Sequence, residues 1–241
     1  MLLAVDAGNS RIKWGLHDGK AWLATGAVPT ANAAGLSEAL SALSPVPSRA
    51  IVSNVAGATT GALIDAAVAA IGAEVVPYGP RAMQAGVQNG YEVPTQLGGD
   101  RWAALIAARR RATGACVVVN AGTTIVVDAL TGSGEFLGGM ILPGFELMLS
   151  VLAERVAGLG PAPGRFEAFP RRTADAMASG AIYAATGAIE AMAQRLAAKT
   201  GETPAILLSG GAAAQLLLHL RGSVEHVEGL VLEGLVIAAK S

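Results

Sequence analysis

The chain has 241 residues, a length that fits either one large α/β domain or two small ones. Its 17 basic and 18 acidic residues give a formal net charge of -1, which argues against a basic face that binds nucleic acid. The single cysteine excludes a disulfide within the chain, and no apolar run approaches the roughly 18 residues of a membrane span, so we expect a cytoplasmic protein with no membrane partner.

The first half of the chain predicts three strands followed by alternating helices and strands. Short runs of valine, leucine and isoleucine favour strands, whereas longer stretches rich in alanine and leucine favour helices. The expected strands cover residues 2–6, 11–17, 21–28, 49–54 and 74–77, and the expected helices cover residues 32–43 and 58–71.

The second half repeats this order from about Gly114. The expected strands cover residues 116–120, 124–130, 136–142, 205–209 and a short segment from Val224, and the expected helices cover residues 144–155 and 173–199, a segment after Gly211 and the C-terminal residues. The repeat predicts two domains of mixed sheet and helices, residues 1–113 and 114–241, with a ligand in the cleft between them.

The first turn of the chain has the features of a phosphate and metal site. The first strand ends at Asp6, a turn of Gly8, Asn9 and Ser10 follows, and the second strand carries Lys13 back alongside. A glycine allows positive φ and close approach of a ligand to backbone N-H groups, while a carboxylate suits a hard cation such as Mg²⁺. An ordinary hairpin with one turn aspartate is the alternative interpretation.

A second turn, from Asn120 to Thr124, lies at the matching place in the second half. Gly122 gives access to the backbone, and Thr123 and Thr124 offer hydroxyl groups. The same residues are also common in plain β-turns, so only the correspondence with the first turn favours a phosphate site.

A third candidate segment lies between the halves, where Gly98 and Gly99 precede Asp100 and Arg101. The helical pattern begins at Ala103, which places Asp100 near a helix N-terminus, where a carboxylate is a common cap. A functional alternative is that Asp100 accepts the proton of a substrate hydroxyl while Arg101 binds an anionic group.

These segments, together with Tyr91 and the glycine-rich segment that ends at Gly144, resemble type III pantothenate kinases from Leu2 to the C-terminal helix. The resemblance implies two ribonuclease-H-like domains around a nucleotide cleft, the fold of the acetate and sugar kinases, heat-shock chaperones and actin. It also implies a homodimer that phosphorylates pantothenate with ATP to give 4'-phosphopantothenate, at the entry to coenzyme A biosynthesis.

The resemblance assigns roles to single residues. Asp6 would organise Mg²⁺ through water, Thr123 would contact ATP, and Asp100 would be the catalytic base. The remaining members of the first ATP-binding segment are Ala7, Gly8, Asn9, Ser10, Arg11, Ile12 and Lys13. The pantothenate-binding residues would be Tyr91, Gly98, Gly99, Asp100, Arg101 and, across the dimer interface, Thr173.

Three positions depart from the family pattern. Asn120 stands where many relatives have an aspartate that helps to hold a potassium or ammonium ion, so we expect the loss of charge to weaken monovalent cation binding, although the amide oxygen could still serve as a neutral ligand. Val126 replaces a frequent threonine, and Ala212 stands where an aspartate often follows the paired glycines on the adenosine side.

The sequence leaves two other functions open. The chain could be a regulatory or accessory homologue that keeps the fold but has lost catalysis, and the departures at Asn120 and Ala212 favour this alternative. It could also be a sugar or acetate kinase of the same superfamily. The presence of Asp6, Lys13, Asp100, Arg101 and Thr173 favours pantothenate kinase.

Overall fold

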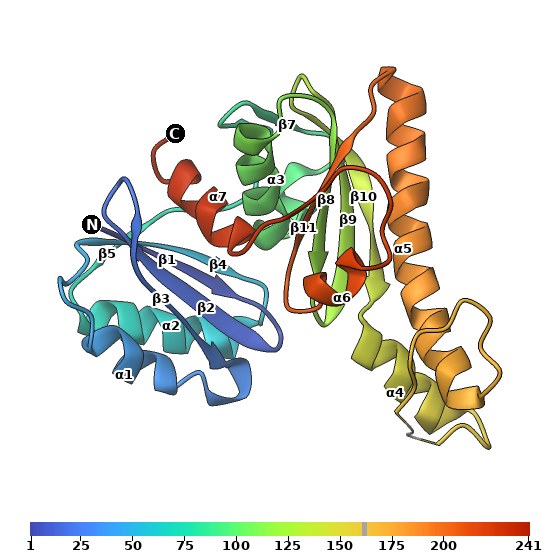
Figure 1. The fold of residues 1–241 in the computed structure, drawn as a ribbon. Helices are drawn as coiled ribbons and strands as arrows, with labels where there is room; N and C mark the ends of the chain where they lie inside the picture. Colours follow the sequence, from blue (N-terminus) through green and yellow to red (C-terminus); the bar gives the residue numbers. More distant parts are fainter. Residues whose placement is uncertain (161–162) are drawn as a thin grey trace. The chain divides into compact units, whose positions relative to one another are not determined.

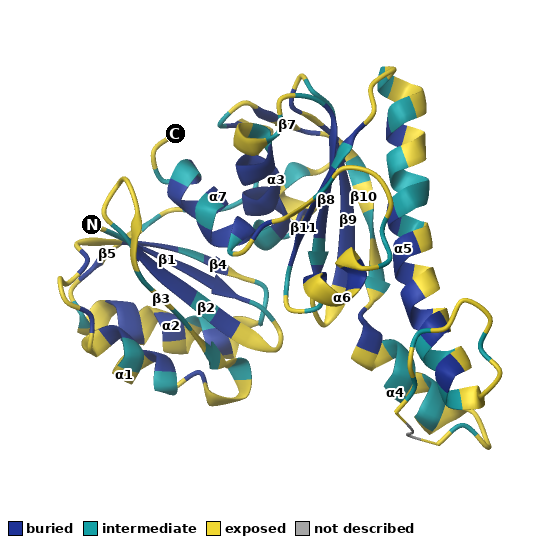
Figure 2. Cartoon of the chain, in the orientation of Figure 1, coloured by how far each residue is buried: buried dark blue, intermediate teal, exposed yellow. Residues whose placement is uncertain are grey.

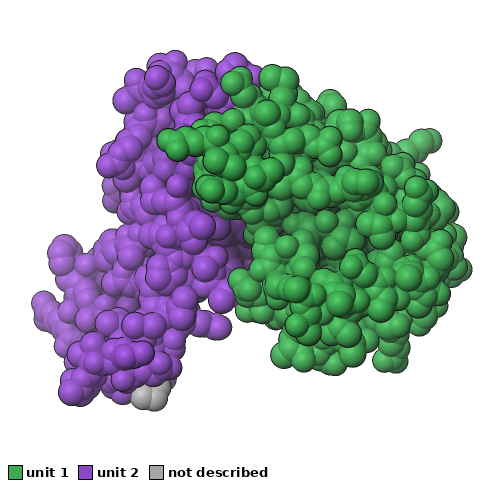
Figure 3. Space-filling view, turned by 180° about the vertical axis from the view of Figure 1, so that it is seen from behind, with its two compact units in different colours: residues 1–111, 229–241 green, residues 112–228 purple. Residues whose placement is uncertain are grey.

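The computed structural model describes residues 1–160 and 163–241, which form two compact units. Unit 1 consists of residues 1–111 and 229–241, and unit 2 of residues 112–228; Figure 3 colours them separately. Our expected boundary at residue 113 assigned the whole C-terminal segment to the second domain. Instead, the C-terminal helix α7 (Leu230–Ala238) folds with unit 1, because its buried apolar side chains contact the first sheet.

Unit 1 contains a five-stranded sheet in the order β3-β2-β1-β4-β5 (Figure 1). Short connections join β1, β2 and β3 as antiparallel neighbours, whereas β4 and β5 run parallel to β1. The strands are β1 (Leu2–Ala7), β2 (Arg11–His17), β3 (Trp22–Pro29), β4 (Arg49–Asn54) and β5 (Glu74–Val76).

Helices cover both faces of this sheet (Figures 1 and 2). Leu3, Val5 and Ala7 of β1 point to the core beneath α1 (Gly35–Ser41) and α2 (Ala58–Ala70). Because side chains alternate along a strand, Ala4 and Asp6 point to the opposite face. That face packs against α7 and α3 (Gly99–Arg111), which approach so closely at Gly234 that a side chain there would overlap the Ala103 carbonyl.

Unit 1 also contains elements that the sequence did not predict. They are a two-stranded hairpin, β6 (Met83–Gln84) and β7 (Val87–Asn89), and the short 3-10 helices η1 (Thr30–Asn32) and η2 (Pro94–Gln96). All four are too short to produce a periodic pattern of apolar residues.

Unit 2 repeats the strand order of unit 1: the order β10-β9-β8-β11-β12 matches β3-β2-β1-β4-β5 strand by strand. Again the first three strands of the repeat are antiparallel and the last two run parallel to the first. The strands are β8 (Cys116–Ala121), β9 (Thr124–Leu130), β10 (Glu135–Pro143), β11 (Ala205–Ser209) and β12 (Val224–His226). The expected order of three strands followed by alternating helices and strands is therefore observed in both halves.

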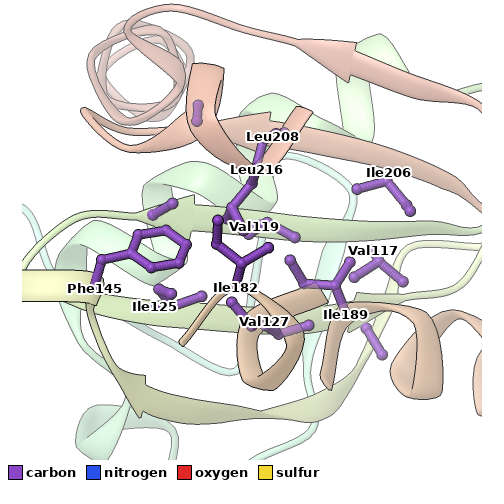
Figure 4. Close-up of a cluster of buried hydrophobic side chains, with 14 of the residues drawn as sticks. Val117, Val119, Ile125, Val127, Phe145, Ile182, Ile189, Ile206, Leu208 and Leu216 are labelled. Atoms are coloured by element: carbon purple, nitrogen blue, oxygen red, sulfur yellow. The ribbon is translucent and has the colours of Figure 1, made fainter. Parts of the chain in front are cut away.

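The core of unit 2 lies between the sheet and the long helix α5 (Thr173–Thr200), with α6 (Ala213–Leu217) at its edge (Figure 4). Val117 and Val119 of β8 meet Ile182 and Ile189 of α5, whereas the alternating Cys116 and Val118 are buried on the opposite face of the sheet. Helix α4 (Phe145–Arg155) precedes α5 and contacts it. Among the described helices, none has both the length and the apolar character required to cross a membrane.

Candidate active site

Asp6 lies near the end of β1, between two polar residues of the neighbouring strands. Its Cα is paired with Lys13 on β2 and with Ser53 on β4. Residues paired in this way place their side chains on the same face of a sheet. The result is a row of ammonium, carboxylate and hydroxyl groups on the face that α3 and α7 cover.

The turn after Asp6 is held by its backbone and by Thr30. The Gly8 N-H donates to the Arg11 carbonyl at 3.0 Å, and the Thr30 hydroxyl donates to the Gly8 carbonyl at 2.7 Å. Asn9 and Ser10 are exposed, so their polar groups are accessible to a ligand. Gly8 does not adopt the positive φ that glycine would permit here; the turn closes without it.

The catalytic candidate Asp100 lies in the first turn of α3. This helix begins at Gly99, four residues earlier than the apolar pattern predicted, and the Asp100 carboxylate accepts the Arg101 N-H at 2.9 Å. A Cβ at Gly98 would lie 2.6 Å from the same carboxylate oxygen. The glycine therefore leaves the space that this carboxylate occupies.

Asp6 and Asp100 interact electrostatically. Burial, and secondly the negative charge of Asp100, raise the pKa of Asp6 to about 7, while Lys13 acts in the opposite direction. One Asp6 oxygen, Oδ1, is buried and has no hydrogen-bond partner in the part of the chain that is described. A buried, ionisable and unpartnered oxygen at the end of a strand fits a metal ion or its water ligands.

Arg101 and Tyr91 form the other side of the Asp100 segment. Arg101 is buried, its Nη1 donates to the Tyr91 hydroxyl at 2.7 Å, and its guanidinium lies 5.5 Å from the centre of the Tyr91 ring. The contact orients a cationic group and an aromatic ring together. Both residues were predicted to bind substrate, and the structure brings them together.

Sequence reasoning missed Tyr78 and Ser53, which enclose the start of α3. The Tyr78 hydroxyl donates to the Gly99 carbonyl at 2.6 Å. A Cβ at Gly99 would lie 3.0 Å from Ser53 Oγ and 3.4 Å from a ring carbon of Tyr78. Ser53 could have been placed next to Asp6 only from the spatial order of the strands in the sheet, because β1 and β4 are neighbours there but distant in sequence.

The second turn has the same construction in unit 2. Asn120 lies near the end of β8 and is paired with Val126 on β9 and Ser209 on β11. Two glycines pack against this turn. A side chain at Gly144 would overlap the Gly122 carbonyl, and one at Gly210, whose φ is 104°, would overlap the Ala121 carbonyl.

Thr123 and Thr173 also lie in unit 2, on different elements. Thr123 is exposed in the second turn, and its carbonyl accepts the Gly144 N-H at 2.9 Å. Thr173 is the exposed first residue of α5. Two residues later, buried Asp175 accepts the Arg165 N-H at 3.0 Å and so fastens the preceding loop to this helix.

An apolar groove runs between α4 and α5, close to Thr173. It has a volume of about 370 Å³ and is lined by Pro143, Leu147, Met148, Val151, Leu152, Ala176, Met177, Gly180 and Ala181. Leu147 and Val151 are 40% and 46% exposed, which leaves apolar surface uncovered.

The two matching sheets and the strand-end polar groups define the α/β fold of the sugar kinases and actin-like ATPases. A putative 2-dehydro-3-deoxygalactonokinase from Sinorhizobium meliloti aligns with a TM-score of 0.60 over 99% of this chain and 98% of its own, at 17% identity. A putative Baf family transcriptional activator from Campylobacter jejuni aligns with a TM-score of 0.62 over 99% of this chain and 97% of its own, at 18% identity.

Sequence comparison identifies the family within this fold. Residues 2–195 match the family model described as type III pantothenate kinase. A type III pantothenate kinase from Nitrosospira multiformis is 46% identical over 100% of this chain and 91% of its own length. The chain belongs to the type III pantothenate kinase family, whose members transfer phosphate from ATP to pantothenate.

Proposed function

We propose that Asp100 is the catalytic base with which this chain phosphorylates pantothenate at its hydroxyl group to give 4'-phosphopantothenate. The observation that carries the assignment is the electrostatic interaction of Asp100 with Asp6, because a proton acceptor must act near the group that organises the transferred phosphate. Phosphoryl transfer requires mainly positioning and charge neutralisation, so a carboxylate of modest basicity can accept the proton late in a loose transition state.

The Asp6 segment is assigned to the phosphates of ATP and to Mg²⁺. Asp6 would hold the metal through water, Lys13 would neutralise phosphate charge, and the N-H groups of the turn would bind phosphate oxygens. Bound Mg²⁺ supplies charge compensation for the phosphates. The buried, unpartnered Oδ1 of Asp6 supports this assignment.

Pantothenate is assigned to the residues around the start of α3. Arg101 would bind its carboxylate, Tyr91 would contact its carbon chain, and the backbone at Gly98 and Gly99 would bound the space around it. The buried position of Arg101 supports this, because a guanidinium is a strong and directional partner for a carboxylate when water is excluded.

Thr123 is assigned to ATP, because it is an exposed hydroxyl residue of the second turn, against which Gly144 and Gly210 pack. Asn120 is assigned to a weak site for potassium or ammonium. Its amide oxygen is a neutral ligand, so we expect weaker binding than at an aspartate.

A homodimer through the α4–α5 groove is the oligomeric state that we propose, with Thr173 contributing to the pantothenate site of the partner subunit. The apolar lining of the groove and its closeness to Thr173 support it.

Val151→Asp places a charge in the groove, so sedimentation should show monomers, and the KM for pantothenate should rise. A dimer that survives this change would contradict the assignment, and Glu154→Lys, on the same helix but outside the groove lining, is the control.

A substrate panel tests the proposed function. Purified protein receives Mg²⁺ and ATP with pantothenate, a set of sugars or acetate, in the presence and absence of potassium or ammonium. We expect ADP to form with pantothenate but not with the sugars or acetate, and mass spectrometry to identify phosphorylated pantothenate as the product. Turnover of a sugar or acetate would support the second kinase class, and no turnover by folded protein would support an accessory homologue in the cytoplasm.

A further inference from the structure

Ser53 is a buried polar residue to which the proposed reaction assigns no role. Its side chain is 1% exposed, and its hydroxyl has no hydrogen-bond partner among residues 1–160 and 163–241. Buried hydroxyl groups are normally paired, as Thr186 is with the Ile182 carbonyl at 3.0 Å. A hydroxyl that does not stabilise the fold through such a bond needs another explanation.

The position of Ser53 supplies one. Ser53 on β4 is the parallel register partner of Asp6 on β1, so both side chains rise from the same face of the sheet. Asp6 Oδ1 is likewise buried and unpartnered within the described residues, although a carboxylate is a strong acceptor for a neighbouring hydroxyl. The two oxygens therefore do not satisfy each other, and both remain available to a third group.

The start of α3 lies directly beside this buried position. A Cβ at Gly99 would lie only 3.0 Å from Ser53 Oγ, so the glycine spares the hydroxyl a contact that any side chain at this position would make. Asp100 follows directly, so the hydroxyl lies within the cluster of Asp6, Lys13 and Asp100 rather than in the apolar core beneath the opposite face.

We propose that Ser53 is a further residue of the magnesium site, where its hydroxyl binds a water ligand of the metal alongside Asp6. This inference rests on the proposed role of Asp6. Mg²⁺ keeps several of its waters in proteins, and these waters need oxygen partners beyond a single carboxylate. A hydroxyl can both donate to and accept from water, and residues that support metal ligands in this way alter metal affinity substantially when removed.

The test measures how strongly Mg²⁺ enhances nucleotide binding. The dissociation constant of a non-hydrolysable ATP analogue is determined by calorimetry with and without Mg²⁺, for the wild type, Ser53→Ala, Asp6→Asn and Thr60→Val. Thr60 is the control because it is another buried hydroxyl residue of unit 1, on α2 beneath the opposite face of the sheet. We expect Ser53→Ala to reduce the Mg²⁺ enhancement about tenfold, to leave metal-free affinity unchanged, and to match the wild type in thermal stability or exceed it.

Three results would overturn the inference. An unchanged Mg²⁺ enhancement in Ser53→Ala would show that the hydroxyl does not support the metal. An equal loss of affinity with and without Mg²⁺ would indicate a contact to the nucleotide, and a clear fall in melting temperature would indicate a structural role. If the wild type itself showed no enhancement, or if Asp6→Asn kept it, the metal assignment to Asp6 would fail instead.

Discussion

Asp6 and Asn120 occupy the same position in the two repeats. Each is the penultimate residue of the first strand of its sheet, and each is paired with one residue of the antiparallel second strand and one of the parallel fourth strand. In unit 1 the three paired residues are Lys13, Asp6 and Ser53; in unit 2 they are Val126, Asn120 and Ser209. The repeat therefore supplies two strand ends, of which only the first carries charge.

The neutral strand end of unit 2 predicts how the proposed cation site responds to added charge. Asn120→Asp restores a carboxylate, so we expect the potassium concentration for half-maximal kinase activity to fall about tenfold. The measurement is the initial rate against potassium or ammonium concentration at fixed ionic strength. An unchanged activation curve would remove Asn120 from the cation site.

The raised pKa of Asp6 predicts that the stability of the metal-free protein depends on pH. The unfolded carboxyl ionises near 3.8 and the folded one near 7, so the folded state binds more protons between these values and its stability falls as the pH rises through them. The full difference corresponds to at most about 4 kcal/mol. In urea denaturation with a chelator, the wild type should lose more stability between about pH 5 and pH 8 than Asp6→Asn does.

The control for this effect is Asp65→Asn, which alters an exposed carboxylate on α2 and should follow the wild type. Parallel pH profiles for the wild type and Asp6→Asn would show that the burial of Asp6 is not costly.

Gly98 is expected to determine the position of the Asp100 carboxylate, the proposed catalytic base. In Gly98→Ala the new Cβ meets the Asp100 oxygen at 2.6 Å, so the carboxylate must move. We expect kcat to fall at least about tenfold, since small displacements of a reacting group have large effects on rate. Steady-state kinetics checks this against Gly79→Ala, where a Cβ has no neighbour within 4 Å among the described residues. Equal kcat values for the two variants would contradict the role of Gly98.

The order of strands and helices along the chain was predictable because each strand carries its own apolar run and the runs recur in the same order in both halves. Helix α3 began earlier than predicted because Gly99 and Asp100 are not apolar, yet the Asp100 carboxylate and the Tyr78 hydroxyl support its first turn. The place of α7 was not predictable, since its mostly apolar residues could cover either sheet.

The candidate site was predictable where its residues are close in sequence. Asp6 and Lys13 face each other across a three-residue turn, so the hairpin alone pairs them. Ser53 and Tyr78 reach the same region only through the parallel strands β4 and β5. A local sequence pattern does not predict which distant strands pair in parallel.

The turnover of Asp100→Asn tests the proposed catalytic base most directly. This change keeps the shape of the side chain but removes the proton acceptor, so kcat should fall about 100-fold or more while the affinity for ATP stays within about twofold. Asp65→Asn serves as the matched control, and single-turnover measurements of 4'-phosphopantothenate formation isolate the chemical step. Wild-type turnover by Asp100→Asn would contradict the assignment of Asp100 as the base.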